Sequence, residues 1–136
     1  SGAQMDLRSL LRRFREWLVR PASRPRTSAG ADVQTLAVLR DAIQRKKQII
    51  AFRGRGRRPL VFCPHALASG AGRWYVLAFV VVGERADDED LQSPARWRWI
   101  PVTELSQVVQ REGFWFSAPR ESRPELRTVR IELDAA

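Results

Sequence analysis

The sequence is poor in the side chains that form covalent cross-links and metal sites. Cys63 is the single cysteine and His65 the single histidine among 136 residues. One cysteine cannot form an intramolecular disulfide, and with one histidine it does not complete the four ligands of a structural zinc site. We therefore expect no metal and no cofactor, and a reducing compartment, of which the cytoplasm is the simplest.

Long apolar runs are missing as well. The most apolar stretch, residues 76–82, has the length of a buried strand and falls far short of the roughly 20 residues that a membrane-spanning helix needs. We expect no transmembrane segment and no secretory leader. Residues 1–4, which precede Met5, would fit the remnant of an expression tag.

Lysine is also scarce, although the chain is strongly basic. The formal net charge is +9, and only Lys46 and Lys47 among the 24 basic residues are lysines. Guanidinium groups suit bidentate phosphate contacts and stacking on bases, so an acidic polymer is the natural partner. A GC-rich genome and the demands of solubility would give the same composition, so charge alone does not decide.

The sequence motifs of common enzyme classes are absent too. There is no phosphate loop and no dinucleotide fingerprint. Cys63 and His65 stand two positions apart, but Pro64 between them predicts the end of a strand, and no third orienting residue can be assigned. The acidic run at residues 87–90 lacks the ligand spacing of an EF-hand. We predict that the chain is not an enzyme.

Two helices and a linker are expected at the start of the chain. In residues 6–20 apolar side chains recur at steps of three and four opposite a face of arginines, which predicts a basic amphipathic helix within residues 1–20. It could pack on the domain or on a second copy, lie on a membrane or follow a phosphate backbone; packing is favoured, and a homodimer is expected. Residues 21–31 are interpreted as a linker, and Asp32 as the N-cap of a second helix.

Beyond the second helix the pattern changes to short strands rich in β-branched and aromatic residues. The expected strands are residues 48–53, 58–64, 74–82, 96–102 and 107–110. Turns are expected at Gly54 and Gly56, at residues 69–72 and in an acidic loop at 84–94. The predicted fold class is therefore α+β: a small five-stranded, closed or nearly closed barrel preceded by helices, with a domain at residues 32–116.

Residues 117–136 are expected to form a C-terminal extension. Residues 114–116 could pack back on the barrel, and residues 128–133 have the composition of a short strand. That strand could belong to a partner chain or to a domain outside this sequence.

Four motifs between Leu39 and Phe116 resemble a known family. They are Leu39-Arg40-Asp41-Ala42-Ile43, Ile49-Ile50-Ala51-Phe52, Cys63-Pro64-His65-Ala66-Leu67 and Arg73-Trp74-Tyr75-Val76-Leu77-Ala78. The stretch resembles the WYL domain of bacterial transcription regulators and of CRISPR and phage-defence proteins. Its signature triplet is Trp74-Tyr75-Val76, with valine where the family has leucine.

The resemblance implies an Sm-like barrel that senses ligands through a polar pocket for a nucleotide or nucleic acid. The positions that match the pocket by motif are Phe52, Gly54, His65, Arg73 and Arg96. Phe52 replaces the usual tyrosine and Gly54 a common serine, which removes two hydroxyl groups. Pro101 stands where the family usually has a second arginine, for which Arg98 could substitute.

The residues also make a case of their own. Strand alternation would place Arg96 and Arg98 on one face, facing phosphates or pairing with the acidic loop, and Trp97 and Trp99 on the other face as core. The run 53–58 alternates arginine with glycine, which suits close contact with a single strand but equally makes an ordinary exposed hairpin. His65 could bond a base edge, or it could be a structural histidine.

These observations combine into one functional hypothesis. The candidate nucleic-acid or nucleotide site comprises Phe52, Arg53, Gly54, Arg55, His65, Arg73, Tyr75, Arg96 and Arg98. We expect a regulatory module that binds single-stranded DNA or RNA, or a nucleotide signal, and passes occupancy to a transcription or defence effector. Any DNA-reading domain would lie outside this sequence. The alternative is a protein-interaction or dimerisation module with a vestigial pocket.

Overall fold

The computed structural model describes residues 33–56, 58–127 and 129–135. The expected basic helix at residues 6–20 and the linker at 21–31 lie outside these residues. The elements of the described part are α2 (Val33–Arg45), β1 (Gln48–Arg53), β2 (Leu60–Gly70), β3 (Arg73–Val82), β4 (Trp97–Pro101), β5 (Leu105–Arg111) and β6 (Arg130–Asp134). Short 3-10 helices are η1 (Ala86–Asp88), η2 (Pro94–Arg96), η3 (Val102–Glu104) and η4 (Arg120–Ser122).

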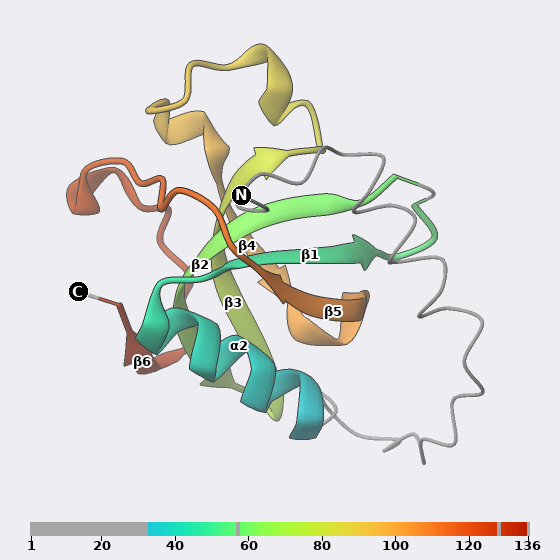
Figure 1. The fold of residues 1–136 in the computed structure, drawn as a ribbon. Coiled ribbons are helices and arrows are strands. Elements are labelled where there is room, and N and C mark those ends of the chain that lie inside the picture. Colours follow the sequence, from blue (N-terminus) through green and yellow to red (C-terminus); the bar gives the residue numbers. More distant parts are fainter. Residues whose placement is uncertain (1–32, 57, 128, 136) are drawn as a thin grey trace.

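The six strands form one antiparallel sheet in the order β4-β3-β2-β1-β5, and β6 also pairs with β2. β3 follows one edge of β2 along most of its length. On the other edge, β1 pairs with the first part of β2 and β6 with the last part (Figure 1). In the described part of the chain β4 and β5 do not pair with each other, so the sheet is not closed. The fold is α+β as expected, with a six-stranded antiparallel sheet, and full closure of the expected barrel is not found.

Pro64 does not end its strand, contrary to expectation. β2 continues through Pro64 to Gly70, because the register with β3 shifts between Pro64 and Ala66 and leaves His65 as the extra residue of a bulge. Proline has no backbone N–H to donate to the ladder and is tolerated at such an interruption. The expected tight turn is present: Gly70 pairs with Arg73 across a two-residue turn whose residues both have positive φ.

The last strand belongs to this chain's own sheet and not to a partner or an additional domain. β6 pairs with β2 from Ser69 back to Ala66. The backbone N–H of Ala135 then donates to the carbonyl of His65 at 2.8 Å, beside the bulge. The C-terminal extension thus completes the edge of β2 where β1 no longer reaches it.

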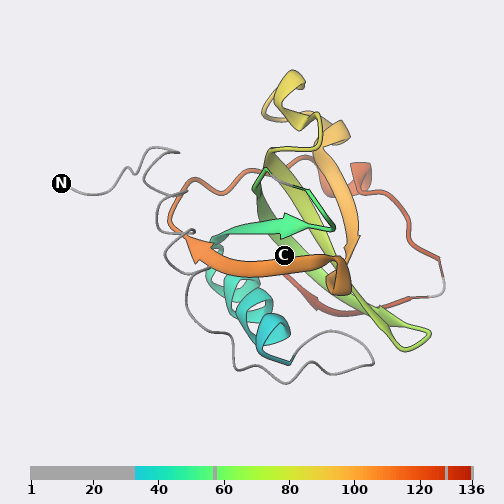
Figure 2. The ribbon, with the colours of Figure 1, turned by 90° about the vertical axis from the view of Figure 1, so that its right-hand side faces the viewer.

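Helix α2 covers one face of the sheet (Figure 2). Leu39, Ala42 and Ile43 are fully or almost fully buried against a core that includes Ile49 and Ala51 of β1. The alternating residues of β1 point to the opposite face, because successive side chains of a strand lie on opposite sides. No helix of the described residues is long and apolar enough to cross a membrane.

The opposite face is aromatic and lies under residues 112–127. We call it the aromatic face: Cys63, His65, Ala66, Leu77, Phe79, Trp97 and Trp99, with Trp115 and Phe116 packed on them. Trp97 is 4% exposed and Trp99 is half-buried, in line with the expectation that both belong to the core side of their strand. Of the residues expected to pack back, Trp115 and Phe116 do so, whereas Phe114 is 76% exposed.

Candidate nucleic-acid interface

The residues expected to form one site lie in three places. Phe52, Arg53, Gly54, Arg55 and Arg98 gather where β1 and β3 end, with Arg96 buried beneath them. Arg73 and Tyr75 belong to the other end of β3, and His65 is enclosed in the aromatic face. A single pocket that contains all nine residues is therefore not formed.

Strand pairing explains why one group of arginines comes together. We call this group the arginine end: Arg53, Gly54, Arg55, Arg58, Glu84, Arg85, Arg98 and Glu104. The pairing of Val61 with Val82 places the residues before β2 beside those after β3. Gly83 makes the close approach there, since a Cβ on it would lie 3.1 Å from the Leu60 side chain.

Arg53 is held between two carboxylates. Its Nη1 donates to Glu84 Oε1 at 2.7 Å and its Nε to Glu104 Oε1 at 3.0 Å. Burial disfavours the charge of Arg53, but the bonds to Glu84 and Glu104 outweigh it and raise the pKa of the guanidinium. Arg53 therefore stays charged and fixed in place.

Gly54 fixes the turn that follows. Its N–H donates to the carbonyl of Glu104 at 2.8 Å, and its φ of 58° lies in the left-handed region that glycine adopts without strain. A glycine therefore suits this backbone better than the serine common in the WYL family.

Arg98 shares a carboxylate with Arg53. Its Nε lies 3.8 Å from Glu84 Oε2, and its guanidinium donates to the carbonyls of Ala95, Trp97 and Glu84. The described carboxylate partner is thus Glu84, and none of Asp88, Glu89 and Asp90 pairs with Arg98.

The remaining described arginines of this end have no side-chain partner among the described residues. Arg55, Arg58 and Arg85 are exposed, and none of them has a side-chain hydrogen bond or an ion pair with any described residue. With Arg53 and Arg98 they place five guanidinium groups against the two carboxylates of the arginine end. The excess of positive charge belongs to this set of residues, since the acidic residues Asp88, Glu89 and Asp90 follow Arg85 closely in the chain.

Arg96 is not exposed, and the expectation that it faces outward is wrong. Its side chain is enclosed, with 3% of the residue accessible, and it donates to four backbone carbonyls. These are Val80 at 2.9 Å, Val81 at 3.0 Å, Glu89 at 2.5 Å and Asp90 at 2.7 Å. Arg96 belongs to η2 and precedes β4, so strand alternation does not set its direction.

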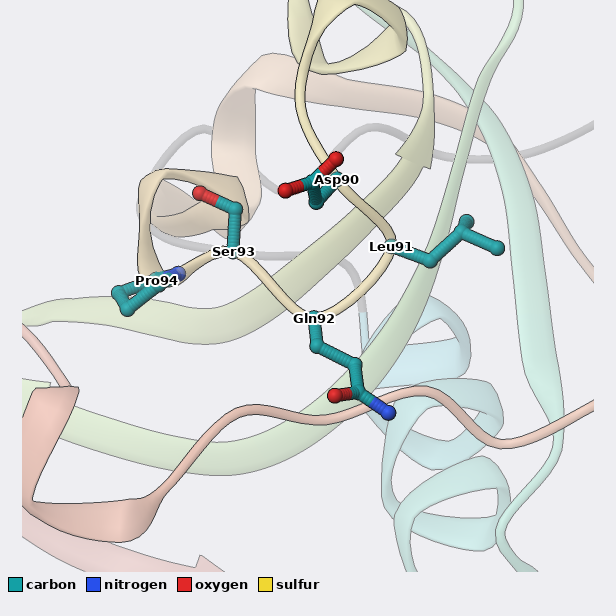
Figure 3. A pocket seen from close by; sticks show the side chains of 5 residues that line it. All are labelled: Asp90, Leu91, Gln92, Ser93 and Pro94. Atoms are coloured by element: carbon teal, nitrogen blue, oxygen red, sulfur yellow. The ribbon is translucent and has the colours of Figure 1, made fainter.

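The loop that Arg96 holds carries a hollow of about 600 Å³, lined by Asp90, Leu91, Gln92, Ser93 and Pro94 (Figure 3). In Figure 3 the side chains of Leu91 and Gln92 point away from those of Ser93 and Pro94. Ligand sites usually gather several convergent polar groups from different elements. This hollow comes from one short stretch of chain and has no such convergence.

Cys63 and His65 do not form a reactive pair. Burial raises the pKa of the Cys63 thiol to about 11 and lowers the pKa of His65 to about 4. At neutral pH the thiol is therefore protonated and the imidazole uncharged, whereas a thiol nucleophile has to ionise. Both side chains bond residues 114–116: His65 Nε2 donates to the Phe116 carbonyl at 2.9 Å, and Cys63 Sγ accepts from the Phe116 N–H at 3.3 Å.

Arg73 and Tyr75 form a separate surface. Arg73 is exposed at the hairpin turn, and Tyr75 is half-buried between Ala68 and Pro101. Val80, whose carbonyl binds Arg96, lies seven positions along β3 from Arg73, which corresponds to roughly 23 Å. Arg73 and Arg96 thus cannot contact one small ligand together.

Three residues of the arginine end were missed from the sequence. Glu84, Arg85 and Glu104 are distant in the chain from the run at residues 53–58, and the register between strands brings them to it. Among the described residues no group of three or more histidine, cysteine, aspartate or glutamate side chains could hold a metal ion.

No protein-family model and no curated protein matches the sequence. Among solved structures, one similar chain is the proteasome accessory factor B/C (PafBC) of Arthrobacter aurescens, with a TM-score of 0.48 and 13% sequence identity. The match covers 74% of this chain and 16% of the PafBC chain, so this chain spans a small part of that protein's length. A likeness of this degree identifies neither a family nor a function.

Proposed function

We propose that this chain is a regulatory binding module whose arginine end holds the phosphates of single-stranded nucleic acid. The observation that carries the proposal is the set of exposed guanidinium groups on Arg55, Arg58 and Arg85, which have no partner among the described residues and lie beside the turn that Glu104 fixes. Arginine contacts to phosphate position a nucleic acid without reading its sequence. The expected ligand preference is therefore for the backbone and not for particular bases.

A fixed turn makes such a surface more effective. Arg53 is already ordered by Glu84 and Glu104, so the backbone of Gly54 and Arg55 is held before a ligand arrives. Binding then orders few additional groups and loses less conformational entropy. Phe52 precedes Arg53 and is half-buried with Ile50 and Val61 on the other face of β1. A base could stack on it at the edge of this end.

The proposed contacts differ from those implied by the family resemblance. His65 and Arg96 are each 3% exposed and act inside the fold, whereas Phe52, Arg53, Gly54, Arg55 and Arg98 remain part of the site together with Arg58 and Arg85. In this proposal the module signals that nucleic acid is bound. The signal passes to a transcription or defence effector, or to a DNA-reading domain outside this sequence. The resemblance to the WYL family supports that role.

Two matched triple variants test the proposal. One replaces Arg55, Arg58 and Arg85 with alanine, and the control replaces the exposed Arg40, Arg45 and Arg130. Each lowers the formal net charge by three, so a general charge effect would be equal in both. Fluorescence anisotropy of a labelled single-stranded oligonucleotide, measured over a range of salt concentrations, gives affinity and salt dependence.

We expect the arginine-end variant to bind at least about tenfold more weakly and the control to change less than about threefold. Three lost phosphate contacts should also reduce the slope of log K against log salt by about 2. Equal losses in the two variants, or no binding by the unaltered chain, would refute the proposal. A stable protein complex unaffected by either variant would favour the interaction-module alternative.

A further inference from the structure

Phe114 is an exposed aromatic ring on a fixed piece of backbone. Its ring is turned to solvent, with 76% of the residue accessible, and its carbonyl accepts from Gln48 Nε2 at 2.6 Å. Gly113 allows this close approach, since a Cβ on it would lie 2.6 Å from the Gln48 side chain. The Phe116 ring stands edge-on to Phe114, with 6.3 Å between the ring centroids. The ring is therefore held in one place although solvent surrounds it.

Two cations lie at this part of the molecule. Arg111 pairs with Gln48 across β1 and β5, and directly paired residues of antiparallel strands point to the same face. Lys46 is exposed in the turn that leads from α2 into β1. Burial is the main cause of the shifted pKa values of His65 and Cys63, but the charge of Lys46 also lowers the first and that of Arg111 the second.

The carboxylates of this region are already paired with other cations. Lys47 donates to Glu112, and Arg45 lies 3.4 Å from Asp41. Lys46 and Arg111 have no ion pair with any described residue, so the surroundings of the Phe114 ring keep a positive charge. A single exposed apolar side chain needs no explanation, but a fixed ring beside unpaired cations matches a partner that has flat rings and negative charges.

This place lies at the far end of β1 from the arginine end. Gln48 and Arg53 are five positions apart in β1, or about 17 Å. Stacked nucleotides rise about 3.4 Å each, so about five of them cover that distance. Phe52 lies on the same face of β1 as Gln48 but is half-buried, so Phe114 offers a base the freer ring.

We propose that Phe114 is a base-stacking contact that makes the module selective for single strands, an inference that rests on the proposed function. The arginine end holds phosphates, which single and double strands share. Stacking on Phe114 needs an unpaired base, because the bases of a duplex are stacked on each other. Lys46 and Arg111 hold the phosphates next to that base.

An oligonucleotide of abasic sites separates stacking from charge, because it keeps the phosphates and lacks the bases. We expect Phe114→Leu to weaken binding of an ordinary single strand at least about fivefold and of the abasic strand less than about twofold. Phe114→Trp should bind the ordinary strand as tightly as the unaltered chain or more tightly. Val33→Ala, at an equally exposed apolar residue of α2, should change neither affinity. Fluorescence anisotropy measures all four proteins.

Two further comparisons separate this contact from the arginine end. Lys46→Gln combined with Arg111→Gln should weaken both oligonucleotides and reduce the slope of log K against log salt by about 1. Adding Phe114→Leu to the triple variant of the arginine end should still weaken the ordinary strand selectively, measured at low salt.

The possible failures are distinct. If the unaltered chain binds no oligonucleotide, the proposed function is refuted and this contact with it. If the chain binds and Phe114→Leu has no effect, or weakens both strands equally, only the stacking contact is overturned. A change in sedimentation without a change in oligonucleotide binding would overturn it as well, and would assign the ring to contact with a second copy.

Discussion

The arginine end and the aromatic face use their polar side chains in opposite ways. Arg55, Arg58 and Arg85 face solvent with no described partner. Cys63 and His65 of the aromatic face, together with Gln48 of β1, bond the backbone of residues 114–116. The difference follows from the backbone groups that each place offers. An irregular segment that crosses a sheet needs side chains to satisfy its N–H and C=O groups, and the donors and acceptors committed to it are not available for a ligand.

Arg96 lies near the arginine end, but its side chain bonds the protein backbone, as the polar side chains of the aromatic face do. A chain with twenty-two arginines can place the same side chain in either role. What decides is whether uncommitted carbonyls lie within reach, as Val80, Val81, Glu89 and Asp90 do for Arg96. Position in a basic motif is therefore weak evidence for ligand contact.

Arg96→Met is expected to have the largest effect among substitutions that test this contrast. It removes the donor of four carbonyls around the 89–90 loop, so the free energy of unfolding should fall by about 4 kcal/mol. Urea unfolding followed by tryptophan fluorescence measures the change. Arg55→Met, with no partner to lose, should stay within about 0.5 kcal/mol of the unaltered chain. Comparable losses in the two variants would break the distinction between the roles.

Lowering the pH should reduce the free energy of unfolding through His65, which lies in the aromatic face. Its pKa is about 4 in the folded chain against 6.5 for a free histidine, because burial disfavours the charged ring. Between pH 6.5 and about pH 4 the unfolded chain binds a proton at His65 that the folded chain does not bind. The contribution of His65 to the free energy of unfolding is therefore fully present above pH 6.5 and is lost as the pH falls toward 4. The loss by about pH 4 should be roughly 3 kcal/mol.

Urea unfolding at a series of pH values measures this loss. His65→Gln keeps an N–H donor but does not titrate, so its stability should depend much less on pH in the same window. An unchanged pH dependence in His65→Gln would assign the acid sensitivity to other groups.

Gly54→Ser should have the smallest effect of the three. It introduces the hydroxyl common in the WYL family but places a side chain at a φ of 58°, which should destabilise the fold by about 1 kcal/mol. Thermal and urea unfolding measure the cost, and oligonucleotide anisotropy shows whether the hydroxyl adds a contact. If Gly54→Ser binds the oligonucleotide more tightly than the unaltered chain, position 54 contacts the ligand, as the resemblance to the WYL family implies.

Local sequence pattern was sufficient for much of the fold. β1 was expected at residues 48–53 and is found there, and β3 differs from its expected range by one residue at its start. Both strands show dense β-branched and aromatic residues between clear turn residues. The failures at Pro64 and β6 have a different cause, because a bulge and a shared strand edge depend on which partner lies alongside.

The site could be predicted less well for the same reason. The turn at Arg53, Gly54 and Arg55 is a local feature and was recognised. Its neighbours Glu84 and Glu104 are brought in by the pairing of β2 with β3 and of β1 with β5, and no pattern within a short window contains that information. The alternation of side chains along a strand also predicted the wrong direction for Arg96, because this residue belongs to a 3-10 helix that precedes the strand.

The sharing of one edge of β2 between β1 and β6 bears on the order of folding. β2 and β3 are joined by a two-residue turn, and β1 is the strand just before β2, so these pairings close short loops and can form early. β6 reaches β2 only after a long loop has closed, at a larger cost in chain entropy. Residues 120–127 lie over the aromatic face and precede β6, so we expect this segment to be placed late in folding and to open early in unfolding.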